Sequence, residues 1–263
     1  MILLLFLITA VLAPLVAPYS PSMVHESGFS LPPMFIDSSS GFVLGTDDLG
    51  RDTLSRLIYG ARVSLGVGLM VVILSATVGV LLGLLSGYFG GWFDTVIMRF
   101  VDILMSLPSI LLAIVVVSVL GPSLTNAIIA VSIVALPGFI RVVRGSVLAE
   151  KNKTYVSASK GFGASHFRVA VQNVLPNCMA PIIVQATLGF SDGILNVAAL
   201  GFLGLGAQPP TPEWGVMLSD ARAYIESAWW LVTLPGLCIL IVVLSFNLLG
   251  DGLRDALDPK LKN

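Results

Sequence analysis

Charged side chains are scarce in this sequence. Only 11% of its 263 residues are Asp, Glu, Lys or Arg, whereas 56% are hydrophobic and the mean hydropathy is +0.95. A soluble domain typically carries about 25% charged residues, so most of this surface must face lipid or other apolar helices. The formal net charge of −1 also lacks the basic excess that a nucleic-acid-binding protein needs.

Cysteine and histidine are equally rare. Cys178 and Cys238 stand in apolar surroundings at no zinc or redox spacing, and we interpret them as buried thiols. The only two histidines, His25 and His166, fall in loops predicted on opposite sides of a membrane, so they do not form a metal or acid–base pair. The sequence also lacks a phosphate-binding Gly-x4-Gly-Lys-Ser/Thr loop. We therefore expect no catalytic residue, no metal site and no bound cofactor in this chain.

Long apolar runs recur along the whole chain. Because a helix needs about 20 mostly apolar residues to cross a bilayer, the pattern predicts an all-α polytopic membrane protein that forms one domain. The first run lacks the basic start and the cleavage site of a signal peptide, so we interpret it as a transmembrane helix. Because no polar tail precedes it, we expect a chain that is short at its N-terminus. The six predicted spans are about 1–17, 63–85, 103–120, 124–140, 178–200 and 228–249.

Six spans place both termini on one side of the membrane. The predicted outer loops are 18–62 and 201–227, and the longest loop on the side of the termini is 141–177. Lysines and arginines number ten on the side of the termini and four on the other. Since cytoplasmic loops carry the excess of basic residues, both termini are predicted to be cytoplasmic.

The cytoplasmic loop 141–177 is too polar for the membrane but has helical character. Residues 154–162 and 165–174 are predicted to form two short helices, joined by a turn at Gly163. Ser165 is the expected N-cap of the second helix, and Pro176 is expected to end it. From the pattern alone, the loop is either a helical hairpin that docks into a partner protein or an amphipathic linker on the membrane surface.

The segment from Tyr155 to Ser165, followed by Val174-Leu175-Pro176-Asn177, resembles the EAA loop of binding-protein-dependent ABC importer permeases. The usual Glu-Ala-Ala is replaced here by Ser157-Ala158-Ser159, which puts a salt bridge from the first position in doubt. The resemblance implies that the loop docks into a cleft of an ATPase subunit, and our hypothesis is that Phe162, His166 and Phe167 fill that cleft. The residues expected to couple to the ATPase are Tyr155, Ser157, Ala158, Phe162, Gly163, His166, Phe167, Leu175 and Pro176.

Further motifs extend this resemblance over nearly the whole chain. Residues 45–52, 199–206, 209–215 and 250–259 are similar to segments of the dipeptide, oligopeptide and nickel subfamily, and most similar to C-type subunits of dipeptide permeases. The resemblance implies a type I ABC importer permease fold in the bacterial inner membrane. It also implies a second homologous permease, two ATPases that bind ATP and Mg²⁺, and an external solute-binding protein. The implied function is alternating-access uptake, with dipeptides, longer peptides, haem, glutathione and nickel complexes all open as solutes.

A few polar residues lie within the predicted spans. Asp192 lies in the middle of the fifth span, Asn196 follows one turn later, and Gln185 adds polarity to the same helix. A charged side chain in the membrane is costly unless it faces a cavity or a partner. We predict that these three residues line the solute pathway, with hydrogen bonding between helices as the alternative. Near the cytoplasmic end of the third span, Asp102 is predicted to pair with Arg99.

Three other classes of membrane protein fit this sequence less well. An ion-coupled secondary transporter is the main alternative, but it would need a coupled set of intramembrane carboxylates, and only Asp192 lies deep in a span. A membrane-embedded enzyme would need clustered His, Glu or nucleophile motifs within the spans. A channel would need a selectivity-filter segment, which the sequence does not contain.

Overall fold

The protein is almost entirely helical in its computed structural model, which describes residues 1–26 and 28–257. Within these residues, the extended backbone pairs only at two isolated bridges, Val24 with Arg51 and Thr46 with Asp52. The α-helices are α1 (Ile2–Val11), α2 (Ala13–Val16), α3 (Thr53–Phe89), α4 (Gly91–Met105), α5 (Ser109–Leu120), α6 (Leu124–Glu150), α7 (Thr154–Gly161), α8 (His166–Arg168), α9 (Met179–Phe202), α10 (Trp214–Ala221) and α11 (Trp230–Leu257).

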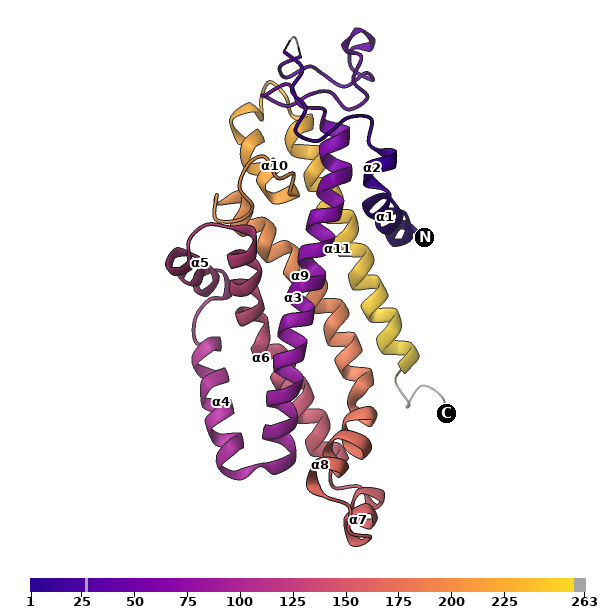
Figure 1. Cartoon of the computed structure of the whole chain (residues 1–263), viewed down its shortest axis with the longest axis vertical. Helices are drawn as coiled ribbons and strands as arrows, with labels where there is room; N and C mark the ends of the chain where they lie inside the picture. Colours follow the sequence, from indigo (N-terminus) through magenta and orange to yellow (C-terminus); the bar gives the residue numbers. More distant parts are fainter. Residues whose placement is uncertain (27, 258–263) are drawn as a thin grey trace.

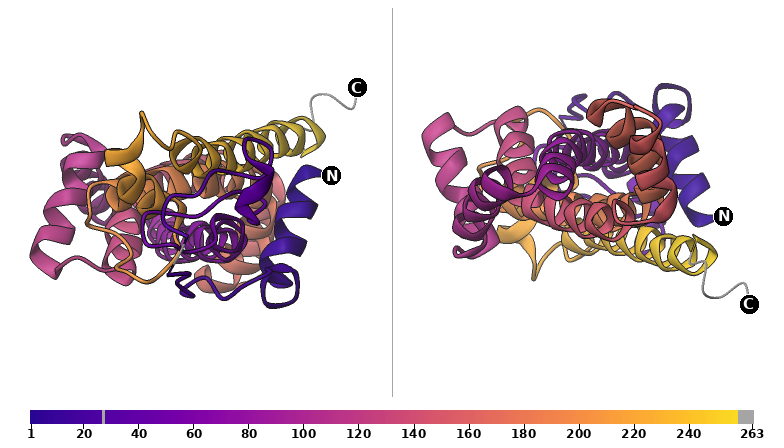
Figure 2. Two further views of the ribbon diagram at one scale, coloured as in Figure 1. Left: turned by 90° about the horizontal axis from the view of Figure 1, so that it is seen from above. Right: turned by 90° about the horizontal axis from the view of Figure 1, so that it is seen from below.

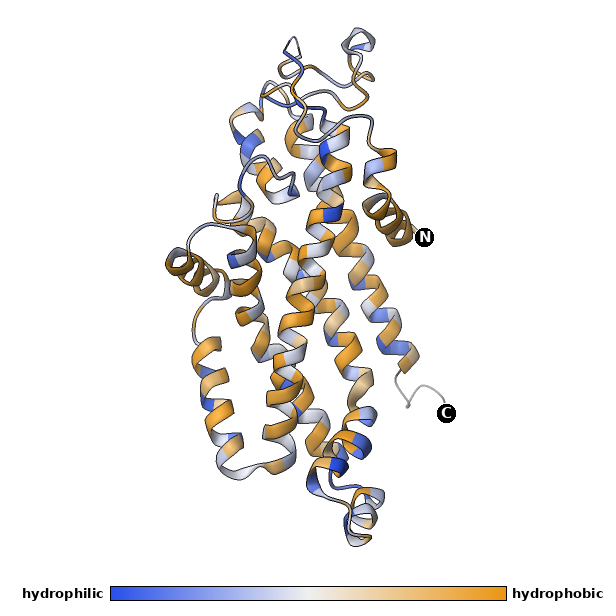
Figure 3. Ribbon diagram, in the orientation of Figure 1, coloured by the Kyte–Doolittle hydropathy of each residue, from blue (hydrophilic) through white to orange (hydrophobic). Residues whose placement is uncertain are grey.

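The long helices form an elongated bundle with a polar end at each extremity. Residues 17–26 and 28–52 and helix α10 lie at one end, and α7 and α8 lie at the other (Figure 1). Apolar residues dominate the long helices between these ends (Figure 3). The N-terminus and the last described helix, α11, lie on the same flank of the bundle in both end-on views (Figure 2). This distribution suits a chain that crosses a lipid bilayer along its long axis.

Helix α3 is much longer than the span predicted at 63–85. Its 37 residues extend over about 55 Å at 1.5 Å per residue, beyond the roughly 30 Å of a hydrocarbon core. The first three turns of α3 thus precede the predicted span and continue into it without a break. Asp52 caps the helix, because its carboxylate accepts the backbone N–H of Ser55 at 2.8 Å. The predicted outer loop 18–62 therefore includes the first residues of this helix.

The third predicted span, 103–120, is not one straight helix. Helix α4 begins at Gly91 and runs beside α3, and α5 then departs from it at 94° (Figure 1). The break lies between Met105 and Ser109, where Pro108 precedes the first residue of α5. Proline lacks an N–H group and disfavours a helical conformation at the preceding residue. Pro108 therefore accounts for the break, whereas the size of the bend depends on the helices that α4 and α5 contact.

The number of membrane crossings differs from the six predicted. Among the described residues, four helices are long and apolar enough to cross a membrane, and the bent pair α4–α5 makes a possible fifth. The predicted first span, 1–17, is divided between α1 and α2, and α1 has only 10 residues. The last predicted span, 228–249, begins two residues before α11 and otherwise falls within it.

Small residues allow α3 to pack closely against α6. Gly79, Gly83 and Gly87 occur every four residues along one face of α3, opposite Phe139, Val143 and Val147 of α6. These three α6 side chains are fully buried. Such stripes of small residues let two helix backbones approach each other in a membrane. The remaining core forms where α9 packs on α3, α6 and α11.

Candidate functional site

The predicted helical hairpin is present at one end of the bundle. Helices α7 and α8 are joined by a turn in which Gly163 has φ +84°, a left-handed conformation that favours glycine. The Ser165 side chain accepts the backbone N–H of Arg168 at 3.3 Å and so caps α8. The turn and the cap are as the sequence predicts.

Pro176 does not end the second arm of the hairpin, contrary to our expectation. The chain continues from His166 to Phe202 as one helical path, through a π-helical turn over Val169–Val174 and a 3₁₀ turn over Leu175–Cys178. Proline is tolerated at the start of a helical turn, where its missing N–H leaves no hydrogen bond unmade. The hairpin is therefore joined without interruption to the membrane helix α9.

Hydrogen bonds fix the base of the hairpin to the end of α6. The Tyr155 hydroxyl donates to Glu150 at 2.5 Å and accepts from the Asn177 amide at 3.1 Å, and Lys153 pairs with Glu150 at 2.7 Å. Desolvation and the hydrogen bond to Glu150 raise the pKa of Tyr155 to about 12. The hydroxyl thus stays protonated at neutral pH and donates to the buried carboxylate. Buried Val156 completes the contact with the bundle.

Two aromatic side chains project from the hairpin into solvent. Phe162 is 92% exposed and Phe167 is 76% exposed. His166 instead lies against the bundle, with Nδ1 at 3.3 Å from the Tyr88 hydroxyl. Large apolar side chains that remain exposed at the polar end of a membrane protein are typical of a protein interface.

The other predicted hairpin residues lie on several faces. Tyr155, Ala158, Phe162 and Gly163 line an open groove of about 700 Å³ between the two arms. Ser157 and Pro176 are exposed, whereas Leu175 is half-buried against the core. The structure thus brings part of the predicted set together around one groove.

The three polar residues predicted on the fifth span meet in one cavity. Asp192, Asn196 and Gln185, all on α9, line a cavity of about 360 Å³ that α6 closes on the opposite side. The Asn196 amide donates to the Asp192 backbone carbonyl at 2.8 Å. Within the described residues, no hydrogen bond or ion pair reaches the Asp192 carboxylate.

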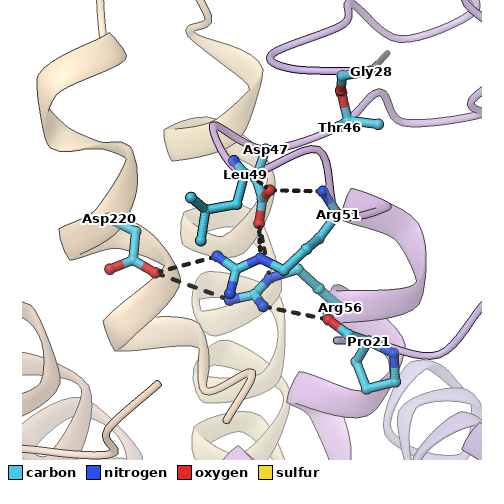
Figure 4. A network of polar contacts seen from close by, with 8 residues as sticks. All are labelled: Pro21, Gly28, Thr46, Asp47, Leu49, Arg51, Arg56 and Asp220. Atoms are coloured by element: carbon cyan, nitrogen blue, oxygen red, sulfur yellow. Dashed lines mark hydrogen bonds and ion pairs between the residues drawn. The ribbon is translucent and has the colours of Figure 1, made fainter. Parts of the chain in front are cut away.

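A cluster of ion pairs at the outer end was not predicted from the sequence (Figure 4). Arg51 and Arg56 have nearly buried side chains, and their Nε atoms lie 2.6 and 3.3 Å from Asp47 Oδ2. Both guanidinium groups also lie 3.9 Å from Asp220 of α10. Burial raises the pKa of Asp220, against the lowering effect of the two arginines. The cluster joins the outer segment to α10.

Glu213 forms a second unpredicted link at this end. Its carboxylate accepts the backbone N–H groups of Gly215 and Val216 at 3.0 Å each and the Ser64 hydroxyl at 3.1 Å. It therefore caps α10 and fastens it to α3. Burial raises the pKa of Glu213, although these hydrogen bonds favour the ionised form.

Helices α4 and α6 are held together by two ion pairs near the hairpin end. Arg144 binds Asp94 through two contacts of 2.6 and 2.8 Å. Asp102 pairs with Arg141 at 2.9 Å, not with Arg99 as the sequence spacing suggested. The bend after α4 places α6 beside α4. The spacing of residues along a single helix does not predict such a contact between two helices.

The family described as the binding-protein-dependent transport system inner membrane component matches residues 79–263, which include both the hairpin and the cavity. This chain belongs to that family. It is a permease subunit of an ABC importer and a multi-pass inner-membrane protein.

Curated relatives cover almost the entire permease. It is 57% identical over 99% of its length to the di/tripeptide transport system permease protein DppC of Pseudomonas aeruginosa, and covers 86% of that relative. It is also 57% identical over 97% of its length to the dipeptide transport system permease protein DppC of Escherichia coli K12, again covering 86% of the relative.

Solved structures support the fold. The permease superposes with a TM-score of 0.60 on a chain from the inward-facing MetNI methionine ABC transporter, at 19% identity, covering 77% of this chain and 96% of the other. At this identity the match concerns the fold, which is that of a type I ABC importer permease.

Proposed function

We propose that this permease moves dipeptides and related small peptides across the inner membrane by alternating access. The observation that carries the proposal is the convergence of Asp192, Asn196 and Gln185 on one cavity within the membrane helices. A peptide offers an ammonium group, amide groups and a carboxylate, and a cavity with a carboxylate and two amides matches the first two. The names of the relatives, which concern dipeptides and di/tripeptides, support this substrate class.

The energy for this movement is proposed to come from two partner ATPases that bind ATP and Mg²⁺. The hairpin is attached to α6 at one end and to α9 at the other, and these helices line the cavity. A displacement of the hairpin by a closing ATPase dimer would thus be transmitted to both walls of the cavity. In this arrangement both termini and the hairpin are cytoplasmic. A second homologous permease completes the pathway, and an external binding protein delivers the solute.

Phe162 and Phe167 are the proposed anchors in the ATPase cleft, because both are exposed and lie on opposite sides of the Gly163 turn. His166 has a different role in this proposal: its contact with Tyr88 fixes the hairpin relative to α3. Ser157, which replaces the usual glutamate of the family motif, offers no charge for a salt bridge.

The docking proposal is tested by Phe167→Asp. We expect this substitution to reduce co-purification of the ATPase subunits with the permease pair, because it places a charge in an apolar cleft. Phe35→Asp is the matched control, since Phe35 is also exposed, at 65%, but lies at the outer end of the molecule. Normal ATPase recovery with Phe167→Asp would contradict the docking assignment.

The substrate proposal is tested by uptake into proteoliposomes that contain the complete importer and internal ATP. Dipeptide uptake is expected from the wild type. Asp192→Asn is expected to reduce uptake of dipeptides with a free amino terminus far more than uptake of amino-acetylated dipeptides, because only the former present a cation. If wild-type importer takes up no dipeptide, the substrate class is wrong. If Asp192→Asn lowers uptake of both peptides equally, the ammonium-binding role is wrong.

A further inference from the structure

Two cavities in the membrane bundle meet at a single side chain. The outer cavity, described above, contains Asp192 and Asn196. An inner cavity of about 400 Å³ lies towards the hairpin end and is lined by Val142, Ala180 and Arg254, among others. Gln185 of α9 lines both cavities.

A glycine of α6 lies close to the Gln185 side chain. A methyl group added at Gly138 of α6 would lie 3.2 Å from the Gln185 Nε2 atom, a tight contact. Pro137, the residue before it, lies inside α6 and provides no N–H for the helical ladder. The backbone of α6 therefore has one hydrogen bond fewer where it approaches Gln185, which favours bending at this level.

The Gln185 amide has no partner of its own. Within the described residues, no hydrogen bond to this side chain is formed, although it lies half-buried within a membrane helix. A polar group in this position is expected to bind water or a ligand. An amide both donates and accepts hydrogen bonds, as a peptide bond does, and so can pair with one.

The cavities on either side carry opposite charge. Asp192 lines the outer cavity and Arg254 lines the inner one. A peptide that enters with its ammonium group at Asp192 can reach the amide of Gln185 next, and its carboxylate is attracted towards Arg254.

We propose that Gln185 and Gly138 form the constriction of the solute pathway, and that the Gln185 amide hydrogen-bonds the peptide groups that pass through it. This inference rests on the proposed function for the identity of the solute. The proposed constriction does not depend on that identity, because it is inferred from the two cavities, their shared side chain and the close approach of Gly138.

The test measures how fast a membrane-impermeant maleimide, added from the cytoplasmic face of the assembled importer, reacts with single cysteines. Ala135→Cys reports on the outer cavity and Ala180→Cys on the inner cavity, in a background with Cys178→Ala and Cys238→Ala. The inner cysteine is expected to react in every variant. The outer cysteine is expected to react several-fold faster with Gln185→Ala, which widens the constriction, and several-fold more slowly with Gly138→Leu, which fills it.

Two comparisons separate a constriction from a folding defect. Gly145→Leu is the matched control on α6, since nothing lies within 4 Å of a carbon added there, and it should leave both rates unchanged. Gln185→Ala only removes atoms, so it remains informative if Gly138→Leu does not assemble. Equal reaction of the outer cysteine in the wild type and in Gln185→Ala would overturn the proposal. Because labelling needs no solute, this outcome is distinct from a failure of dipeptide uptake.

Discussion

Glu213 shows how one buried carboxyl group can hold an outer helix in place. It accepts two backbone N–H groups at the start of α10 and the hydroxyl of Ser64 from α3. Burial still dominates and raises its pKa above the ordinary value of 4.5. The folded protein consequently holds this proton more tightly than the unfolded chain does.

This shift predicts a pH dependence of stability. Unfolding exposes the carboxyl group and releases its proton, so the contribution of Glu213 is fully present below the ordinary glutamate pKa and is lost as pH rises through the raised pKa of the folded state. We expect thermal unfolding of the solubilised complex, followed as pH rises from the ordinary glutamate pKa of 4.5, to show this loss in the wild type and not in Glu213→Gln. The exposed residue Glu226 provides the control, Glu226→Gln. Parallel pH profiles for wild type and Glu213→Gln would contradict the prediction.

At the scale of helices, α3 and α6 approach each other closely at glycine positions. A methyl group at Gly83 would lie 2.7 Å from the Val143 Cβ atom and 2.8 Å from the Ile140 carbonyl oxygen. Neither contact can be relieved by turning a flexible side chain. The two helices would have to separate.

We therefore expect Gly83→Ala to lower the free energy of unfolding by about 1–3 kcal/mol, a typical effect of overpacking. Gly66→Ala, on the same helix but with nothing within 4 Å of the added carbon, should leave stability unchanged or slightly raise it through better helix propensity. Chemical denaturation in mixed micelles measures both variants. A Gly83→Ala protein as stable as the Gly66→Ala protein would contradict the close approach.

At the scale of the whole molecule, polar structures at the two ends have different roles. The hairpin at one end exposes the apolar side chains of Phe162 and Phe167, the proposed anchors for an ATPase. At the other end, the cluster of Asp47, Arg51, Arg56 and Asp220 joins the outer segment to α3 and α10 (Figure 4). The arginine side chains are only 6% and 3% exposed, whereas Asp220 is 38% exposed.

This difference in burial predicts unequal effects of removing the two carboxylates. Asp47→Asn takes away the close partner of two buried arginines, which typically costs about 3–5 kcal/mol. Asp220→Asn removes a more exposed and more distant charge, worth about 0–1 kcal/mol. Hydrogen–deuterium exchange of residues 28–52 should therefore rise strongly for Asp47→Asn and little for Asp220→Asn. Equal exchange in the two variants would show that the cluster does not hold this segment.

Much of this architecture follows from local sequence. A bilayer selects runs of about 20 apolar residues regardless of what surrounds them, so the membrane helices that overlap 63–85, 124–140, 178–200 and 228–249 were predictable. The hairpin turn was predictable as well, because the turn at Gly163 and the cap at Ser165 depend only on residues that are close to them in the sequence. The C-terminal motif 250–259 extends beyond the described residues at Asp258 and Pro259, and Lys260 and Lys262, which contributed to the predicted orientation, also lie outside them.

The sequence by itself therefore determined the membrane character, most of the long helices and the hairpin, because each depends on interactions between near neighbours along the chain. Only the tertiary structure decided the 94° bend between α4 and α5, the pairing of Asp102 with Arg141, and the approach of Gln185 to Gly138. These features join residues far apart in sequence, and their geometry depends on how whole helices pack. Spacing placed Asp192 and Asn196 on one helix face, but the packing of α6 against α9 made that face the wall of a cavity.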